Sequence, residues 1–194
     1  MKKFAFYLGL SALIFSQGFA EENFSQNYEN TLKNIVKNVE KFDENLHKFL
    51  DDMYETMIAK KGIGLAAIQV GKPLRALVIN LLNEEGIQDK NDLIEIINPE
   101  ILEKDGEITY QEGCLSVPDF FEDVTRASDI KVRFQNRFGE FIELSASELL
   151  AVCVQHEMDH LDGHLFIEKI SYSQKKKFSK EYKKRLKEKS KWSL

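Results

Sequence analysis

The sequence predicts an α+β fold, on two observations. Segments of strand character follow one another directly in the middle of the chain, and the helical segments stand before and after them. Strands that run into strands before a helix favour α+β over an alternating fold with a parallel sheet. At 194 residues, the chain suits one domain with an adequate core.

The expected elements follow in chain order. A helix is predicted over 43–60, because apolar residues recur there at helical spacing, at Phe42, Leu46, Phe49, Met53 and Met57. Strands are predicted near 74–81, 93–97 and 106–112, at the alternating residues Ile130, Val132 and Phe134, and over 141–144 after a hairpin through 136–139. Two helices then close the chain.

The first of these two helices is predicted to be buried. Residues 145–148 have the form of a capping box, an apolar run covers 149–154, and Gly163 supplies the stop. A helix that is apolar nearly all round lies inside a protein. The polar residues at its end therefore need partners, which a metal ion would provide.

Those polar residues form a metal-binding pattern. Residues 155–163 read Gln-His-Glu-Met-Asp-His-Leu-Asp-Gly, which contains H-E-x-x-H. On a helix, His156 and His160 lie one turn apart on the same face and can bind one divalent metal, while Glu157 faces a metal-bound water. The pattern predicts metal-assisted hydrolysis.

Such a site requires a third protein ligand. In metzincins a further histidine supplies it, but Phe166 occupies that position here and His164 is out of register. The downstream glutamates are Glu168, Glu181 and Glu188, of which the last two lie in a lysine-rich segment. Cys114 is the better candidate, since it follows a strand-like segment at a glycine. A thiolate and two imidazoles leave the fourth position of a tetrahedral site open for water.

A glycine-rich motif follows the first helix. Residues 62–69 read Gly-Ile-Gly-Leu-Ala-Ala-Ile-Gln, and the first six also fit the relaxed dinucleotide-binding fingerprint. That fingerprint needs a strand before it and a helix after it. Here the predicted helix precedes the motif and a predicted strand follows it, so the nucleotide interpretation fails.

Three motifs together resemble the peptide deformylase family. They are residues 62–69, residues 112–116 (Glu-Gly-Cys-Leu-Ser) and residues 155–163, in this order, within a resemblance that spans roughly residues 28–189. The resemblance implies mostly antiparallel sheets packed around a central helix that carries H-E-x-x-H, with a C-terminal helix. It also implies removal of the formyl group from N-formylmethionyl nascent peptides.

The resemblance also implies roles for individual residues. The metal ligands would be Cys114, His156 and His160, which would hold one Fe²⁺ per chain or a substitute such as Zn²⁺, Ni²⁺ or Co²⁺. Glu157 would transfer the proton, and the side-chain amide of Gln69 and the backbone N–H of Leu115 would donate hydrogen bonds to the formyl oxygen.

The resemblance also implies substrate contacts, which come from the first two motifs and from the segments just before the second and third. They are Ile63, Gly64, Tyr110, Glu112, Gly113, Leu149, Val152 and Cys153. Phe121 stands where many bacterial relatives carry an arginine that contacts the peptide backbone, so we expect affinity for longer peptides to depend more on apolar contact here. Arg126 is expected to pair with Glu112 and support the cysteine loop.

The charge distribution is uneven. The net charge is −5, yet residues 171–194 carry ten Lys and Arg against two Glu. A solvated helix is the ordinary interpretation of such a segment, and docking to a polyanion such as ribosomal RNA is the functional one. We expect a monomer that does not bind DNA. The two cysteines do not suggest a disulfide framework, and Cys153 is expected to be a small buried residue.

The N-terminus conflicts with this function. Two lysines precede an apolar stretch over 4–15, and small residues precede Glu21, as in a secretory signal, although the stretch is short for a membrane span. The sequence therefore divides into a signal-like segment 1–20, a catalytic domain 21–170 and a basic helix or tail 171–194. Because substrates are made at the ribosome, we expect the cytoplasm, with a periplasmic or exported protein as the alternative.

Two rival functions remain open at this point. A zincin-type metallopeptidase shares the H-E-x-x-H core, but it would need a downstream third ligand. A non-catalytic, exported relative that binds peptide or metal is the second, but the intact Glu157, Gln69 and ligand set argue against lost chemistry.

Overall fold

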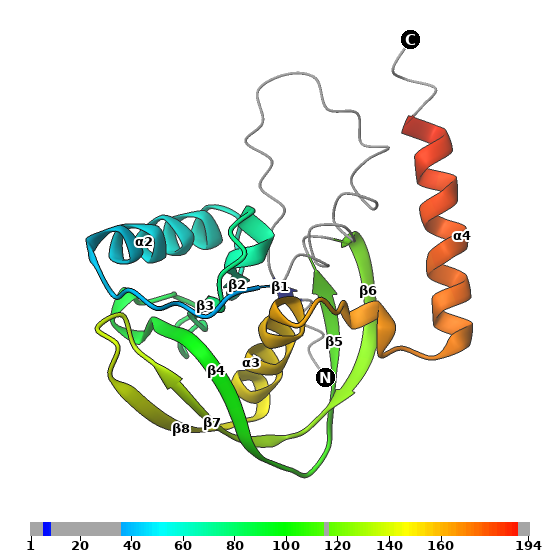
Figure 1. The fold of residues 1–194 in the computed structure, drawn as a ribbon. Helices are drawn as coiled ribbons and strands as arrows, with labels where there is room; N and C mark the ends of the chain where they lie inside the picture. The colour runs from blue at the N-terminus through cyan, green and yellow to red at the C-terminus, as the bar shows by residue number, and fades with distance from the viewer. Residues whose placement is uncertain (1–5, 9–35, 115–116, 190–194) are drawn as a thin grey trace.

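The computed structural model describes residues 6–8, 36–114 and 117–189, with side chains over 36–114 and 120–182 (Figure 1). Its elements are β1 (Phe6–Leu8), α2 (Glu44–Ala59), β2 (Gly64–Ala66), β3 (Ala76–Ile79), β4 (Ile94–Asp105), β5 (Ile108–Cys114), β6 (Val117–Arg126), β7 (Asp129–Gln135), β8 (Phe141–Ser147), α3 (Glu148–Leu161) and α4 (Tyr172–Lys189). No helix among the described residues is long and apolar enough to cross a membrane.

The strands form two sheets around α3. One sheet has five strands in the order β2-β3-β4-β7-β8, and every neighbouring pair in it is antiparallel. The other has the order β1-β5-β6, in which β5 and β6 are antiparallel and β1 is parallel to β5. Figure 1 shows α3 between the two sheets, with α4 outside β6. The predicted α+β fold with a central and a C-terminal helix is confirmed.

The first long helix forms for local reasons that the sequence shows. The Asp43 side chain caps α2 by accepting hydrogen bonds from the backbone N–H groups of Asn45 and Leu46, each at 3.1 Å. The apolar stripe Leu46, Leu50, Met53 and Met57 is buried and packs with residues of β2, β3 and β4. This packing fixes the segment that follows α2, which begins the glycine-rich motif.

The predicted capping box at 145–148 is wrong. Ser145 and Ser147 belong to β8, where they pair with Lys131 and Asp129 of β7, and Ser147 precedes the helix without a side-chain capping bond. Sheet pairing therefore continues up to the first turn of α3 and takes the place of the local cap. The predicted stop is confirmed, because α3 ends at Leu161 and Gly163 follows with a φ of 81°.

The strands of the Cys114 region differ from the prediction in length and in number. β4 continues to Asp105, and β6 pairs along β5, although the sequence of β6 contains a proline and no regular alternation. Cross-strand pairing supplies what the local pattern lacks. As a result, β5 and β6 form a long hairpin whose end carries Cys114.

Candidate metal centre and active site

Cys114, His156 and His160 come together at the end of α3. The Nε2 atoms of the two histidines lie 3.2 Å apart, and the Cys114 Sγ lies 3.5 Å from His160 Nε2. All three side chains are buried, and their ligand atoms lie within 4.8 Å of one another. A tetrahedral site with normal Zn–N and Zn–S bonds separates its ligand atoms by about 3.3–3.6 Å. The spacing therefore fits one metal ion, as the sequence predicted.

A buried carboxylate orients the first histidine. Glu112 Oε2 lies 2.7 Å from His156 Nδ1, which leaves Nε2 as the nitrogen that faces the cluster. Burial alone lowers the pKa of His156, but hydrogen bonds with Cys114 and Glu112 raise it to about 10. For His160, burial and the charge of His156 hold the pKa well below its usual range. Metal ligands must be deprotonated, so metal binding would release a proton from His156.

Glu112 is itself held by Arg126. The guanidinium donates from Nε to Glu112 Oε1 at 2.5 Å and from its second terminal nitrogen to Oε2 at 2.9 Å. Its remaining terminal nitrogen donates to Asp159 Oδ2 at 2.8 Å. Burial raises the pKa of Glu112, but the bonds from Arg126 and His156 overcome it and lower the pKa to about 2. The expected pairing of Arg126 with Glu112 is confirmed.

Three contacts in this region were not expected from the sequence. Asp159 completes the bonds of Arg126, and Lys169 lies 3.2 Å from the other oxygen of Asp159. Phe166, which occupies the position of a metzincin's last histidine, is buried and stacks on the His156 ring at 6.2 Å. The sequence does offer one signal for the contact between Asp159 and Arg126, because Asp159 lies three residues after His156 and so on the same side of the helix.

Glu157 differs from its neighbours because its carboxylate makes no hydrogen bond with the described residues. Its side chain is fully buried, and neither carboxylate oxygen has a hydrogen-bond partner among the described residues. Burial raises the pKa of Glu157 to about 7, although the positive charge of His156 lowers it. The nearby Ala66 N–H lowers it slightly, but that N–H donates its bond to Gln69. A group with this pKa can both accept and return a proton near neutral pH.

The glycine-rich motif packs directly on Glu157. A Cβ built on Gly64 would lie 2.6 Å from Glu157 Oε1, so no side chain fits there without moving the carboxylate. Three residues after β2 begins, the chain turns into a short 3₁₀ helix, Ala67–Val70, which carries Gln69. The Gln69 Oε1 accepts from the Ala66 N–H at 2.8 Å, and its Nε2 lies 4.0 Å from the Cys114 Sγ. This bond directs the amide donor of Gln69 toward the cluster.

The other described residues of the sequence-predicted site lie on β5 and α3 or just before β2. Ile63 and Cys153 are buried in one apolar group with Cys114, and Leu149 packs against that group. Val152 is also buried, whereas Tyr110 is half-buried on β5. The Glu112 side chain makes internal contacts only, as described above. Leu115 lies outside the described residues.

Gly113 faces an aromatic ring across the sheet. It pairs with Phe121, and a Cβ built on Gly113 would lie 2.4 Å from the Cε1 of Phe121. Only a glycine allows the ring to lie this close to the backbone of β5. The ring thus covers the residue that precedes the cysteine ligand.

Comparison with known proteins decides the family. The family model described as "Polypeptide deformylase" matches residues 22–176. The chain belongs to this family. A peptide deformylase from Campylobacter jejuni is 62% identical over 148 residues, which cover 76% of this chain and 85% of the relative. One from Helicobacter pylori (strain G27) is 60% identical over 142 residues, which cover 73% and 82%.

Solved structures agree with the sequence relatives. The crystal structure of a peptide deformylase from Legionella pneumophila superposes with a TM-score of 0.72 at 41% identity, covering 81% of this chain and 92% of that one. A peptide deformylase from Plasmodium falciparum superposes with a TM-score of 0.76 at 30% identity, covering 85% and 95%. The chain is therefore a peptide deformylase-type enzyme that removes the N-formyl group from nascent peptides, and the metallopeptidase and non-catalytic alternatives are not favoured.

Proposed function

We propose that Cys114, His156 and His160 hold one Fe²⁺ ion per chain, with Zn²⁺, Ni²⁺ or Co²⁺ as substitutes. Deformylases are metal-dependent, and the cluster supports the assignment of these ligands by its spacing and by the orientation of His156. A thiolate with imidazoles suits several of these ions, so the types of ligand do not by themselves identify the ion. Metal analysis of protein purified without oxygen identifies the ion.

The buried, unpartnered carboxylate of Glu157 carries the mechanistic proposal. When bound, the metal ion supplies Lewis acidity and makes a water acidic enough to lose a proton near neutral pH. Glu157 accepts that proton as the oxygen attacks the formyl carbon, and then delivers it to the leaving amine as formate departs. The fully buried position keeps the carboxylate away from competing solvent.

Negative charge develops on the formyl oxygen during the attack. The Nε2 group of Gln69 would donate a hydrogen bond to it, because Oε1 is already held by the Ala66 N–H. The backbone N–H of Leu115, which follows the cysteine ligand, is proposed as the second donor. A preorganised donor of this kind contributes about 3 kcal/mol to the stability of the transition state.

Substrate contacts are proposed for the residues that line the cluster. Gly64 and Gly113 would let the peptide backbone approach closely, and the apolar group around Ile63, Leu149 and Cys153 would take the methionine side chain. Tyr110, Val152 and Glu112 complete the proposed set, with Glu112 contributing through its support of His156. Phe121 would add apolar contact for longer peptides.

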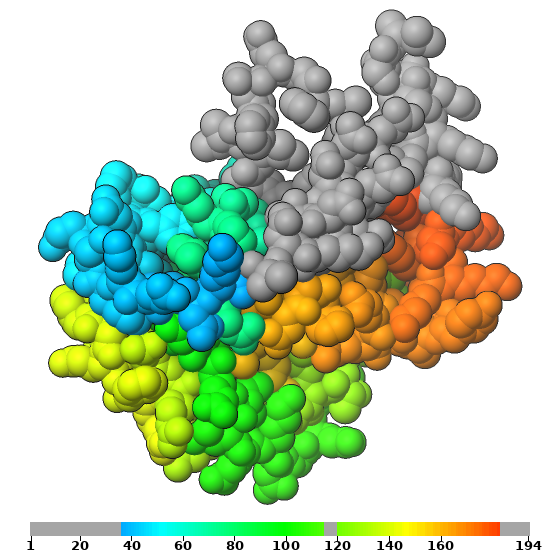
Figure 2. All heavy atoms as spheres, in the orientation of Figure 1, coloured from blue at the N-terminus to red at the C-terminus, as the bar shows by residue number. Residues whose placement is uncertain are grey.

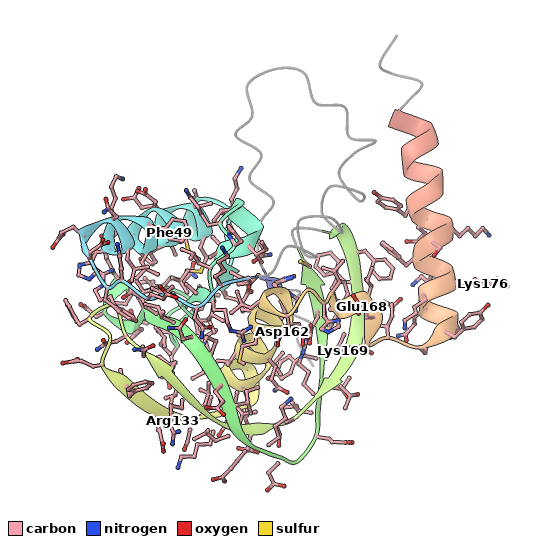
Figure 3. The ribbon with its side chains drawn as sticks, in the orientation of Figure 1. Phe49, Arg133, Asp162, Glu168, Lys169 and Lys176 are labelled. Atoms are coloured by element: carbon pink, nitrogen blue, oxygen red, sulfur yellow. The ribbon has the colours of Figure 1, made fainter. Side chains whose placement is uncertain are left out.

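The basic C-terminal helix is proposed to dock on the ribosome. One side of α4 packs on β6, where Phe178 lies 4.7 Å from the ring of Phe120, and both Lys177 and Gln174 bind Glu122. Lys176 projects away from the body of the protein (Figure 3). In Figure 2, α4 stands at one side of the visible face, opposite α2. The outward lysines are therefore available to a polyanion.

We also propose that the chain divides into a signal-like segment 1–20, a catalytic domain 21–170 and a basic tail 171–194. The protein is proposed to be a monomer in the cytoplasm. N-terminal sequencing of protein from cell fractions tests this location. A chain that begins near Met1 in the cytoplasm is expected, and a mature chain that begins at Glu21 outside the cytoplasm would overturn it.

The direct test of the function is release of formate from formyl-Met-Ala-Ser by protein prepared anaerobically with Fe²⁺. Wild-type protein is expected to turn over, and the same protein after removal of the metal is expected to be inactive. Release of internal peptide fragments without formate would instead indicate an endopeptidase.

A further inference from the structure

The N-terminal strand pairs with the part of β5 that ends at the cluster. β1 lies parallel to β5 with Phe6 opposite Glu112, Tyr7 opposite Gly113 and Leu8 opposite Cys114. β6 already takes the other edge of β5 over the same residues. β1 therefore fills the second edge of β5 beside a proposed metal ligand (Figure 1).

This edge is suited to a peptide strand. Glu112, Gly113 and Cys114 are buried, and backbone groups of a buried edge need hydrogen-bond partners. A peptide that adds to a sheet edge gains its affinity from main-chain bonds and can vary in sequence. The segment Phe6-Tyr7-Leu8 consists of aromatic and apolar residues, of which the two aromatics favour strands.

The direction of β1 distinguishes it from a substrate. β1 runs from the level of Glu112 to the level of Cys114, so its carboxyl end is the end beside the cluster. A formylated substrate must bring its amino end to the cluster. A substrate on the same edge would therefore run antiparallel to β5, and β1 occupies the edge in a direction that presents no formyl group for hydrolysis.

We infer that residues 6–8 are an internal competitor that closes the peptide-binding edge of β5 in the full chain. The inference rests on the proposed function, because the edge matters only if formyl peptides approach Cys114. Because β1 and β5 belong to one chain, β1 competes with the substrate within the molecule, and diluting the protein does not weaken this competition. Binding of substrate then requires β1 to leave, so KM is raised while kcat, measured after β1 has left, is unchanged. An edge that is free one third of the time raises KM about threefold.

The test uses the full-length, metal-loaded chain with single substitutions at Tyr7. Tyr7→Pro removes a backbone N–H and disfavours the strand, whereas Tyr7→Val keeps the N–H and a high strand preference. Two measurements are made on each protein: steady-state kinetics with formyl-Met-Ala-Ser, and hydrogen exchange of the backbone amides over 110–114. Tyr7→Pro is expected to lower KM at least about threefold at constant kcat and to speed exchange of these amides. Tyr7→Val is expected to behave as wild type.

The two measurements separate this inference from the proposed function. Faster exchange in Tyr7→Pro would support the pairing of β1 with β5 in the wild type. If, in addition, none of the proteins released formate, the deformylase proposal alone would be rejected. Equal exchange in all three proteins, or an equal KM in all three active proteins, would overturn the internal competitor. A synthetic peptide of residues 4–10 should also raise the KM of Tyr7→Pro without lowering its kcat.

Discussion

Buried carboxylates on the two sides of α3 differ in whether they have hydrogen-bond partners. On the β5 side, Glu112 meets both Arg126 and His156, and Arg126 also meets Asp159, so each of these groups has charged partners. On the β2 side, Glu157 is as deeply buried, yet its oxygens have no hydrogen-bond partner in the described part of the chain. The first side holds ligands in place, and the second keeps a carboxylate ready to exchange a proton.

The largest effect is expected from removing the ligand that β5 contributes. Cys114→Ala should abolish stoichiometric metal binding and formate release, because two imidazoles hold a catalytic ion poorly. The matched control is Cys153→Ala, which removes a cysteine that is buried on α3 outside the cluster and should keep the metal. Metal content per chain, measured after gel filtration, decides. One tightly held ion and full activity in Cys114→Ala would show that the ligand assignment is wrong.

The β2 side should respond in activity rather than in metal content. Glu157→Gln keeps the size of the side chain and both histidines but cannot accept the proton. It should bind one metal ion per chain and lose turnover by about 10²–10⁴-fold. Metal analysis and formate release are measured on the same sample. Turnover within a factor of two of wild type would exclude Glu157 from proton transfer.

Arg126→Met breaks the compensated side without touching a ligand. Removing one partner of a buried ion pair costs about 3–5 kcal/mol, and a lost outer contact to a ligating histidine weakens metal binding by about 10–100-fold. The control is Arg137→Met. Arg137 binds Glu95 and Asp51 away from the cluster, so its loss should leave metal affinity unchanged. Denaturant unfolding of the metal-free proteins and metal titration measure the two effects.

The same variant gives a defined pH dependence. The pKa of Glu112 is lowered from 4.5 to about 2 in the folded protein, so its contribution to stability is complete above pH 4.5 and is lost as the pH falls toward 2. Without Arg126 the buried carboxylate would instead favour its protonated form. The stability difference between wild type and Arg126→Met should therefore be largest near pH 7 and shrink below about pH 4.5. A difference that grows on acidification would contradict the assignment of this ion pair.

The sequence predicted the residues that depend on local spacing. The helical repeat put His156 and His160 on one face, and the motif around Cys114 supplied the third member of the cluster. Contacts made by distant packing were not predictable in the same way. The pairing of β8 with β7 displaced the expected cap of α3, and the approach of Gly64 to Glu157 depends on how β2 lies against α3. Asp159 was missed because spacing alone does not show which charge reaches Arg126.

The smallest effect is expected at Gly113 of β5, on the side of α3 where the buried charges are paired. Close packing of the Phe121 ring limits the space at this position. Gly113→Ala places a methyl group against the Phe121 ring, which must shift, and overpacking of this kind costs about 1–3 kcal/mol. Phe121→Ala removes the ring that the methyl group would meet. In the Phe121→Ala background, Gly113→Ala should therefore lower the free energy of unfolding much less than it does in the wild type. A double-mutant cycle by denaturant unfolding gives the coupling energy. Additive losses would show that the ring does not limit this position, whereas strong coupling would show that the packing of the Phe121 ring restricts residue 113 to glycine.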